Sequence, residues 1–275
     1  MHPNRPSETI SVPVDSDNDD SVITVARWGS GPVEIILLHD GLGSIAQWRS
    51  IPADLAARTG KGVLAYDRAG HGGSTPTPTG PWPPDWLHRE ADRFGKLLAE
   101  LCKGSLDWGP IEIINPLLVG HSDGGSIALL YAAANDLRDG LRVSGVVTLA
   151  AHSWVEQRCF DAIAQMRADP GPIITGLSRA HDHPAAVFEA WSGVWVSDEF
   201  RPWDIRPLLN TVNCPTLIAQ GVEDEYATSA HAVETAAAIG ANAEWRLLDG
   251  VGHLLHHQDP ELVVDVIAGF QKGEI

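Results

Sequence analysis

The amino-acid sequence predicts an α/β fold: a mostly parallel, doubly wound sheet of about eight strands, with a small helical lid inserted after the sixth strand. Short apolar runs bounded by turn residues recur along the chain, and segments of helix length separate them. The sequence shows no repeat with a fixed period of 20 to 50 residues, which argues against a solenoid or a propeller. One stretch of about 60 residues has helical patterns but no clear strand, and it interrupts the alternation.

The strands are predicted from their apolar content and their boundaries. Residues 9–14 and 21–29 flank the acidic turn DSDNDD and predict an antiparallel hairpin at the start of the sheet. Six further runs are apolar almost throughout, as is typical of parallel strands that helices cover on both faces. These runs are residues 33–39, 62–67, 114–120, 143–151, 214–221 and 243–250.

Helices are predicted where apolar residues recur near helical spacing. Parallel strands need crossover connections, and helices usually supply them. The candidates are residues 46–59, 85–102, 124–135, 229–240 and 261–272.

The interrupting stretch is residues 152–213, with helical patterns at residues 155–167 and 184–195. A connection of this length is either a packed excursion over the sheet or a disordered loop. Its aromatic side chains argue against disorder; they are Trp154, Phe188, Trp191, Trp195 and Trp203. The sequence therefore predicts a core of residues 1–151 and 214–275, and a helical lid of residues 152–213.

The composition narrows the possible partners and the compartment. A formal net charge of −17 opposes binding to nucleic acid or to an anionic membrane, because both need a basic face. Cys102, Cys159 and Cys214 are odd in number and far apart, which is typical of reduced thiols. The N-terminus lacks the apolar segment of a signal peptide, and no apolar run reaches the roughly 20 residues that span a bilayer. We expect a soluble, cytoplasmic protein that binds a small molecule; its oligomeric state is open.

The motif GHSDG, residues 120–124, directly follows an apolar strand pattern and directly precedes a helical one. In this context GxSxG predicts a sharp turn that exposes the serine, here Ser122, at the carboxyl edge of the sheet. The amide groups at the start of the helix would face any negative charge that forms there. Ser122 is therefore a candidate nucleophile.

A serine hydroxyl needs a base, and that base needs an acid to orient it. Asp224 follows one predicted strand and His253 follows the next, so the chain order is Ser122, Asp224, His253. Among the other histidines, His71 and His121 lie in glycine-rich turns, and only His253 combines a preceding glycine with a loop after a strand. Any of the three acidic residues 223–225 could be presented by this loop.

Taken together, these segments resemble the α/β-hydrolase fold superfamily over essentially the whole chain. The motifs are IILLHDGLGS, LAYDRAGHGGS, LVGHSDGG, IAQGVEDEY and GVGHLLHHQDPE. The resemblance implies that Ser122 is the nucleophile, His253 the general base and acid, and Asp224 the residue that orients His253. The spacing from Gly221 in this superfamily favours Asp224 over its two neighbours. The chain is also similar to members in which a helical insert after the sixth strand covers the pocket.

Such a site needs two amide donors for the oxyanion. We expect them at Asp123, directly after the nucleophile, and at Gly41 in the loop HDGLGS, or at Leu42 if that loop holds an extra residue. Asp40 departs from the pattern, because similar proteins often have glycine there. An unpaired carboxylate would oppose the developing charge, so we expect Asp40 to be turned away, or held by loop amides or a cation.

The reaction that the resemblance implies is hydrolysis of a carboxylic ester or lactone of a small, partly hydrophobic substrate through an acyl-enzyme, without cofactor. Cleavage of a carbon–carbon bond in a diketone, perhydrolysis, and small-molecule binding without catalysis are the alternatives. We expect substrate contacts from the tryptophans near the site; these are Trp48, Trp154, Trp191 and Trp195. The stretch HDHP at residues 181–184 could suggest a metal site, but it offers too few ligands, and we expect none.

Overall fold

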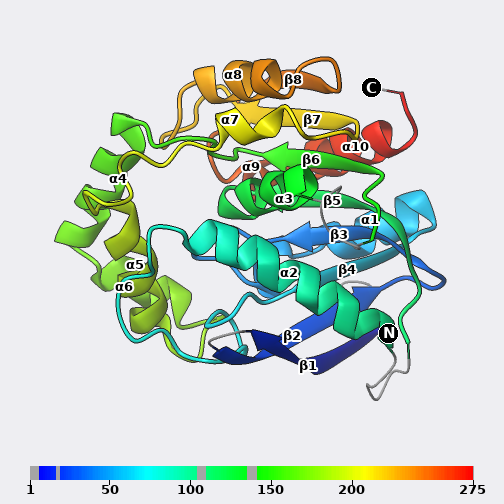
Figure 1. The fold of residues 1–275 in the computed structure, drawn as a ribbon, viewed down its shortest axis with the longest axis horizontal. Helices are drawn as coiled ribbons and strands as arrows, with labels where there is room; N and C mark the ends of the chain where they lie inside the picture. The colour runs from blue at the N-terminus through cyan, green and yellow to red at the C-terminus, as the bar shows by residue number, and fades with distance from the viewer. Residues whose placement is uncertain (1–5, 17–18, 104–109, 135–140, 275) are drawn as a thin grey trace.

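A computed structural model describes residues 6–16, 19–103, 110–134 and 141–274. Its sheet has eight strands in the order β1-β2-β4-β3-β5-β6-β7-β8 (Figure 1). The strands are β1 (Glu8–Ser16), β2 (Asp19–Trp28), β3 (Val33–Leu38), β4 (Gly62–Tyr66), β5 (Ile113–His121), β6 (Gly145–Leu149), β7 (Thr216–Gly221) and β8 (Ala243–Leu248). β1 and β2 form an antiparallel hairpin, β2 pairs antiparallel with β4, and the other pairs are parallel. The predicted fold class is confirmed.

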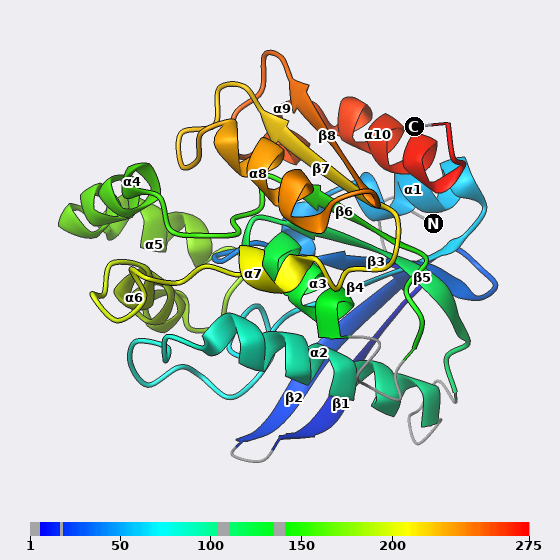
Figure 2. The ribbon, with the colours of Figure 1, turned by 45° about the horizontal axis from the view of Figure 1, so that its top comes forward.

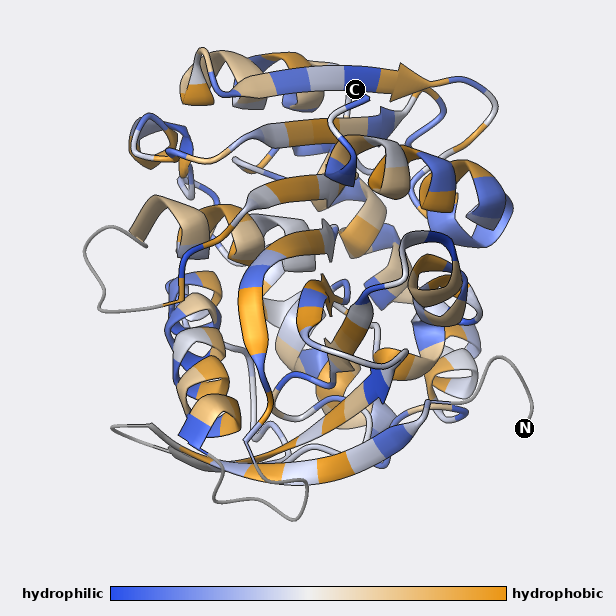
Figure 3. Cartoon of the chain, turned by 90° about the vertical axis from the view of Figure 1, so that its right-hand side faces the viewer, coloured by the Kyte–Doolittle hydropathy of each residue, from blue (hydrophilic) through white to orange (hydrophobic). Residues whose placement is uncertain are grey.

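Helices cover both faces of the sheet, as a parallel sheet requires. One face carries α2 (Trp86–Lys103), α3 (Asp123–Ala134), α7 (Arg206–Leu209) and α8 (Ala230–Ile239), and the other carries α1 (Ile51–Thr59), the short α9 (Leu255–Gln258) and α10 (Pro260–Gln271). Each face therefore has its own apolar core. In Figure 3 the central strands are largely hydrophobic, whereas the surrounding helices carry both hydrophilic and hydrophobic segments.

The helix predicted over residues 46–59 is divided in the structure. Residues Ile45–Trp48 form a 3-10 helix, and α1 begins only at Ile51. Arg49 between them has a φ of 51°, which no α-helix accommodates. Pro52 fits the first turn of α1, where its missing N–H costs nothing.

Between β6 and β7 the chain forms α4 (Gln157–Ala168), α5 (Gly171–Leu177) and α6 (Pro184–Trp195) before reaching α7. Figure 2 shows α4, α5 and α6 together beyond one end of the sheet. The two ends of this insert meet in a short pairing that we call the neck, residues 153–155 and 203–205. There Ile205 N donates to Ser153 O at 2.8 Å, and Val155 N donates to Trp203 O at 3.2 Å.

In the part of the chain that the structure describes, no helix has both the length and the apolar character needed to cross a membrane.

Candidate active site

Ser122 lies at the turn between β5 and α3, with a φ of 51°. That left-handed conformation is strained for a residue with a side chain. The flanking glycines make the turn possible: a Cβ on Gly120 would come within 2.3 Å of Gly124 O, and a Cβ on Gly124 within 2.1 Å of Leu38 O. The tight turn is thus possible only because these two residues have no side chain.

The structure brings Ser122, His253 and Asp224 together from three different loops. The Ser122 hydroxyl donates to His253 Nε2 at 3.0 Å, and His253 Nδ1 donates to both carboxylate oxygens of Asp224 at 3.1 Å. Ser122 follows β5, Asp224 follows β7, and His253 follows β8. These strand ends lie at the same edge of the sheet, which explains why residues 131 positions apart can touch.

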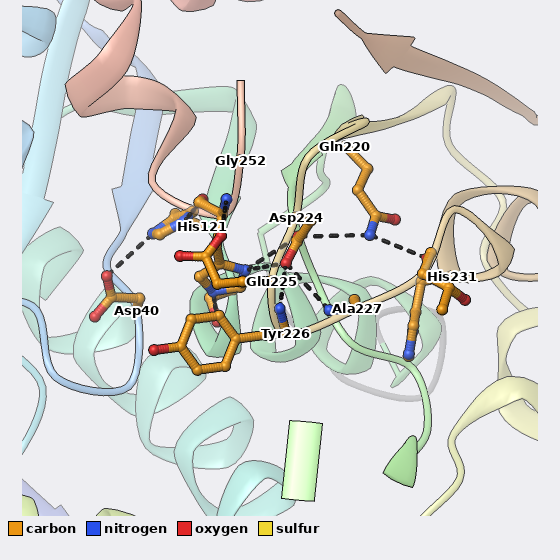
Figure 4. A network of polar contacts seen from close by, with 12 residues as sticks. Asp40, His121, Gln220, Asp224, Glu225, Tyr226, Ala227, His231 and Gly252 are labelled. Atoms are coloured by element: carbon orange, nitrogen blue, oxygen red, sulfur yellow. Dashed lines mark hydrogen bonds and ion pairs between the residues drawn. The ribbon is translucent and has the colours of Figure 1, made fainter. Parts of the chain in front are cut away.

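Asp224 is fixed in its role by backbone amides (Figure 4). Its Oδ1 accepts hydrogen bonds from Tyr226 N at 2.8 Å and from Ala227 N at 3.1 Å. Burial opposes ionisation, but the hydrogen bond and charge of His253 together with the Tyr226 amide lower the pKa of Asp224 to about 2. For His253, burial lowers the pKa, and the stronger opposing influence of Asp224 raises it above the ordinary value. Asp224 is therefore ionised, and His253 is a stronger base than an ordinary histidine.

The neighbouring Glu225 has a different task from Asp224. Its Oε2 accepts from the backbone N of His253 at 3.1 Å, so it holds the loop and not the imidazole. His121, beside the nucleophile, also supports His253 from behind: its Nε2 donates to His253 O at 2.8 Å. Its Nδ1 donates to Asp40 Oδ2 at 3.1 Å.

The carboxylate of Asp40 is engaged on every side. Oδ1 accepts from Leu42 N at 2.8 Å, and Oδ2 accepts from Gln47 Nε2 as well as from His121. Burial opposes its ionisation, but the hydrogen bonds and charge of His121 with the bond from Gln47 lower the pKa of Asp40 well below its usual range. Of the arrangements expected for Asp40, the structure has the one in which a loop amide holds the carboxylate, and the side chains of His121 and Gln47 hold it as well.

The same contacts show which of the two amides expected at the oxyanion, Gly41 or Leu42, is free. The Leu42 amide is already bonded to Asp40, whereas Gly41 N has no partner in the described part of the chain. Asp40 O accepts from Arg68 Nη2 and from Gly43 N. Since C=O and N–H of one trans peptide point in opposite directions, the Gly41 N–H points away from Arg68. The amide of Asp123, at the first residue of α3, has no partner within the helix either.

Arg68 is a site residue that the sequence analysis missed. It is 1% exposed, its guanidinium lies 5.5 Å from the centroid of the Trp86 ring, and it bonds the oxyanion loop. Burial raises the pKa of Asp123 to about 6, and the charge of Arg68 opposes this rise. The only signal in the sequence was the place of Arg68 directly after a predicted strand, in LAYDRAGHGGS.

Ser122 and His253 open into a cavity of about 230 Å³, which we call the Ser122 cavity. The insert supplies its apolar wall: Cys159, Ile163, Met166, Ile173, Leu177, Trp191 and Trp195. Tyr226 and Leu254 line it from the core, and His152 lines it from the segment directly after β6, beside the polar groups already described. Trp191 also donates from Nε1 to Asp123 Oδ2 at 2.9 Å. A groove of about 800 Å³ between residues 76–83 and α2 is larger, but Ser122, Asp224 and His253 do not line it.

Two of the expected substrate contacts lie outside the Ser122 cavity. Trp48 is 1% exposed and belongs to the core on the α1 face of the sheet. Trp154 lies at the neck, where its ring stacks on His231 with centroids 3.7 Å apart and Arg206 covers the ring at 4.1 Å. Both rings are used in packing, so only Trp191 and Trp195 of the four line the cavity.

The HDHP stretch joins the insert to the core. His181 Nδ1 accepts from Gly72 N at 2.9 Å, and His181 Nε2 donates to Leu42 O at 2.9 Å. Both ring nitrogens are thus bonded to backbone. Over the described ranges, no three His, Cys, Asp or Glu side chains are grouped so that they could hold a metal ion.

Comparison with known proteins gives consistent similarities. A family model described as the alpha/beta hydrolase family matches residues 35–266. The esterase Rv0045c of Mycobacterium tuberculosis is 23% identical over 90% of this chain and 85% of its own, and a non-heme haloperoxidase of Rhodococcus erythropolis is 26% identical over 88% and 93%. The solved structure of Est816, described as an N-acyl homoserine lactone degrading enzyme, superposes with a TM-score of 0.66 at 24% identity, covering 94% of this chain and 99% of that one.

Proposed function

Because the chain belongs to the alpha/beta hydrolase family, we propose that it is a serine hydrolase that cleaves a carboxylic ester or lactone through an acyl-enzyme. The observation that carries the proposal is the bridge that His253 makes between Ser122 at 3.0 Å and Asp224 at 3.1 Å. The similarity to an esterase and to a lactone-degrading enzyme supports the same reaction class.

In this mechanism His253 removes the proton of the Ser122 hydroxyl while Oγ attacks the carbonyl carbon. The amides of Gly41 and Asp123 then bind the oxyanion. His253 returns the proton to the leaving alkoxide, which leaves as an alcohol and gives the acyl-enzyme. A water that His253 deprotonates attacks the acyl carbon, and Ser122 recovers its proton as the acid departs.

The Ser122 cavity favours an uncharged, partly hydrophobic acyl or alcohol group. Its wall from the insert is apolar, and neither lysine nor arginine lines it among the described residues. Asp40, Asp123 and Glu225 line it instead, so an anionic substrate would be repelled. We further propose that residues 152–213 act as the lid of a core made of residues 1–151 and 214–275, since α4 to α6 supply this wall.

Replacing Ser122 with alanine tests the proposal. We expect the wild type to hydrolyse p-nitrophenyl butanoate and to be labelled stoichiometrically at Ser122 by a fluorophosphonate, and Ser122→Ala to lose both, with kcat reduced by at least about 10³-fold. Ser229→Ala is the matched control, because Ser229 is exposed and makes no side-chain capping bond. Tight binding of esters by a wild type that neither turns over nor reacts would instead identify a receptor.

The similarity to a haloperoxidase favours perhydrolysis as a second candidate. In that reaction hydrogen peroxide replaces water and the acyl-enzyme gives a peracid. Peracid formation from an uncharged acetate ester and peroxide, lost in Ser122→Ala, would support it.

A further inference from the structure

His152 is a buried imidazole in the Ser122 cavity to which the mechanism assigns no task. It follows β6, which lies between β5 and β7, so it stands between the strand that carries Ser122 and the strand that carries Asp224. Its ring centroid is 5.8 Å from that of His253, and it is 2% exposed.

The ring of His152 has no hydrogen-bond partner anywhere in the part of the chain described. Nδ1 is fully enclosed and unpaired. Nε2 is unpaired too but is not among the enclosed atoms, so it is the ring nitrogen that reaches the cavity. Buried polar groups are almost always paired, so an unpaired imidazole at a ligand cavity points to a ligand.

The position of His152 is fixed even though its ring is unpaired. Ser126 Oγ, on α3, donates to His152 O at 2.6 Å. The ring packs edge-on against Trp195 and His231, with centroids 5.3 Å and 5.0 Å away. A donor held in this way is organised before the substrate arrives, which favours binding.

The imidazole of His152 is neutral. Burial, followed by the nearby His231 and His253, lowers its pKa well below the ordinary value. A neutral imidazole has one N–H and one acceptor nitrogen. The tautomer with its hydrogen on Nε2 presents the donor to the cavity and leaves only an acceptor at the enclosed Nδ1.

We propose that the Nε2–H of His152 binds a second carbonyl oxygen of the substrate, separate from the carbonyl that Ser122 attacks. This inference rests on the proposed function and narrows its substrate class to uncharged compounds with two carbonyl groups, such as oxo esters, acylamino lactones or diketones. A carboxylate does not fit, since a neutral donor leaves its charge uncompensated beside Asp40 and Asp123.

The test compares three p-nitrophenyl esters that differ in one oxygen: pentanoate, 3-oxopentanoate and 4-oxopentanoate, each corrected for its uncatalysed hydrolysis. We expect the wild type to prefer at least one oxo ester in kcat/KM, and His152→Phe to reduce that preference about 10- to 100-fold, as expected for one lost hydrogen bond at a buried site. His152→Gln keeps an N–H donor and should restore part of the preference. Ile163→Ala, which widens the same cavity, should change the rates but not the preference.

Equal losses for all three esters in His152→Phe would show a purely structural role and overturn the inference, as would a wild type without preference. If Ser122 proves unreactive, so that the proposed function fails, binding decides. Tryptophan fluorescence would then compare 2,5-hexanedione with 2-hexanone on Ser122→Ala, with and without His152→Phe. Selective weakening of the dione by His152→Phe supports the inference, and equal weakening of both ligands contradicts it.

Discussion

The carboxylate of Asp40 is fully hydrogen-bonded before any substrate binds. His121, Gln47 and the Leu42 amide take up its carboxylate oxygens. Through His121 the same carboxylate is connected to the backbone of His253. Asp40 therefore links the loop that carries Gly41 with the loop that carries His253, and we propose that it positions both loops for the reaction.

Replacing Asp40 with asparagine should weaken the hydrogen bonds that hold the loop of Gly41 and the loop of His253. We expect kcat/KM to fall on the order of 10- to 100-fold, because small displacements of catalytic groups are costly. The free energy of unfolding should fall by about 3 kcal/mol, since one partner of a buried pair is lost. The depressed pKa of Asp40 means that this stabilisation is present above the ordinary value of 3.8 and is lost as the pH falls further. Denaturant unfolding between pH 3 and pH 8 measures it.

Asp54→Asn is the control for this variant, because Asp54 is exposed in the first turn of α1. It should leave kcat/KM unchanged. A large gain in kcat for Asp40→Asn would contradict our account, because it would mean that the carboxylate faces the oxyanion and opposes it.

The pH dependence of kcat/KM should report His253. Its raised pKa places the rise in activity above the ordinary histidine value of 6.5, since only the neutral ring accepts the serine proton. Burial raises the pKa of Asp123 to about 6, so this carboxyl could add an inflection of its own. The pH profile should therefore be measured in Asp123→Asn as well, and the inflection that remains there belongs to His253.

In Asp224→Asn the largest of the influences that raise the pKa of His253 is gone. The inflection should move to lower pH, and the plateau should fall on the order of 10⁴-fold, as in serine proteases. An inflection that stays in place would show that another group controls the base.

At the scale of elements, the strands and most helices could be predicted because their periodicity is local. The meeting of Ser122, Asp224 and His253 could be predicted because each of them follows a strand and lies within three residues of a glycine. The break at Arg49 could not, because it depends on one backbone angle. Neither could the choice of Trp191 over Trp154 as a cavity residue, because it depends on how α6 packs and on the ring of His231 at the neck.

Trp48 tests this distinction between packing and substrate contact. Trp48→Ala should lower the free energy of unfolding by about 3–5 kcal/mol, because a large buried ring in the 3-10 helix is removed. The KM of the folded variant for p-nitrophenyl butanoate should stay close to that of the wild type. A rise in KM at a temperature where the variant remains folded would show instead that Trp48 contacts the substrate.

At the scale of the whole molecule, the sheet brings distant segments to one edge. Ser122, His152, Asp224 and His253 follow four adjacent strands, β5 to β8. The helices on either face hold these strands in register, so the distances among the four side chains depend on both apolar cores. The strand order explains why these four residues lie at one edge of the sheet, but it does not determine how the imidazole rings of His152 and His253 are oriented.

The neck separates two groups of residues at the Ser122 cavity. Ser122, Asp224 and His253 lie outside residues 156–202, whereas the apolar wall of the Ser122 cavity that α4 to α6 supply lies within them. Both ends of that stretch emerge side by side, bonded to each other. Exchanging the segment between these two points for that of a related protein should change which acyl groups fit the cavity, while Ser122, Asp224 and His253 stay in place. Substitutions within the segment would have the same effect during evolution.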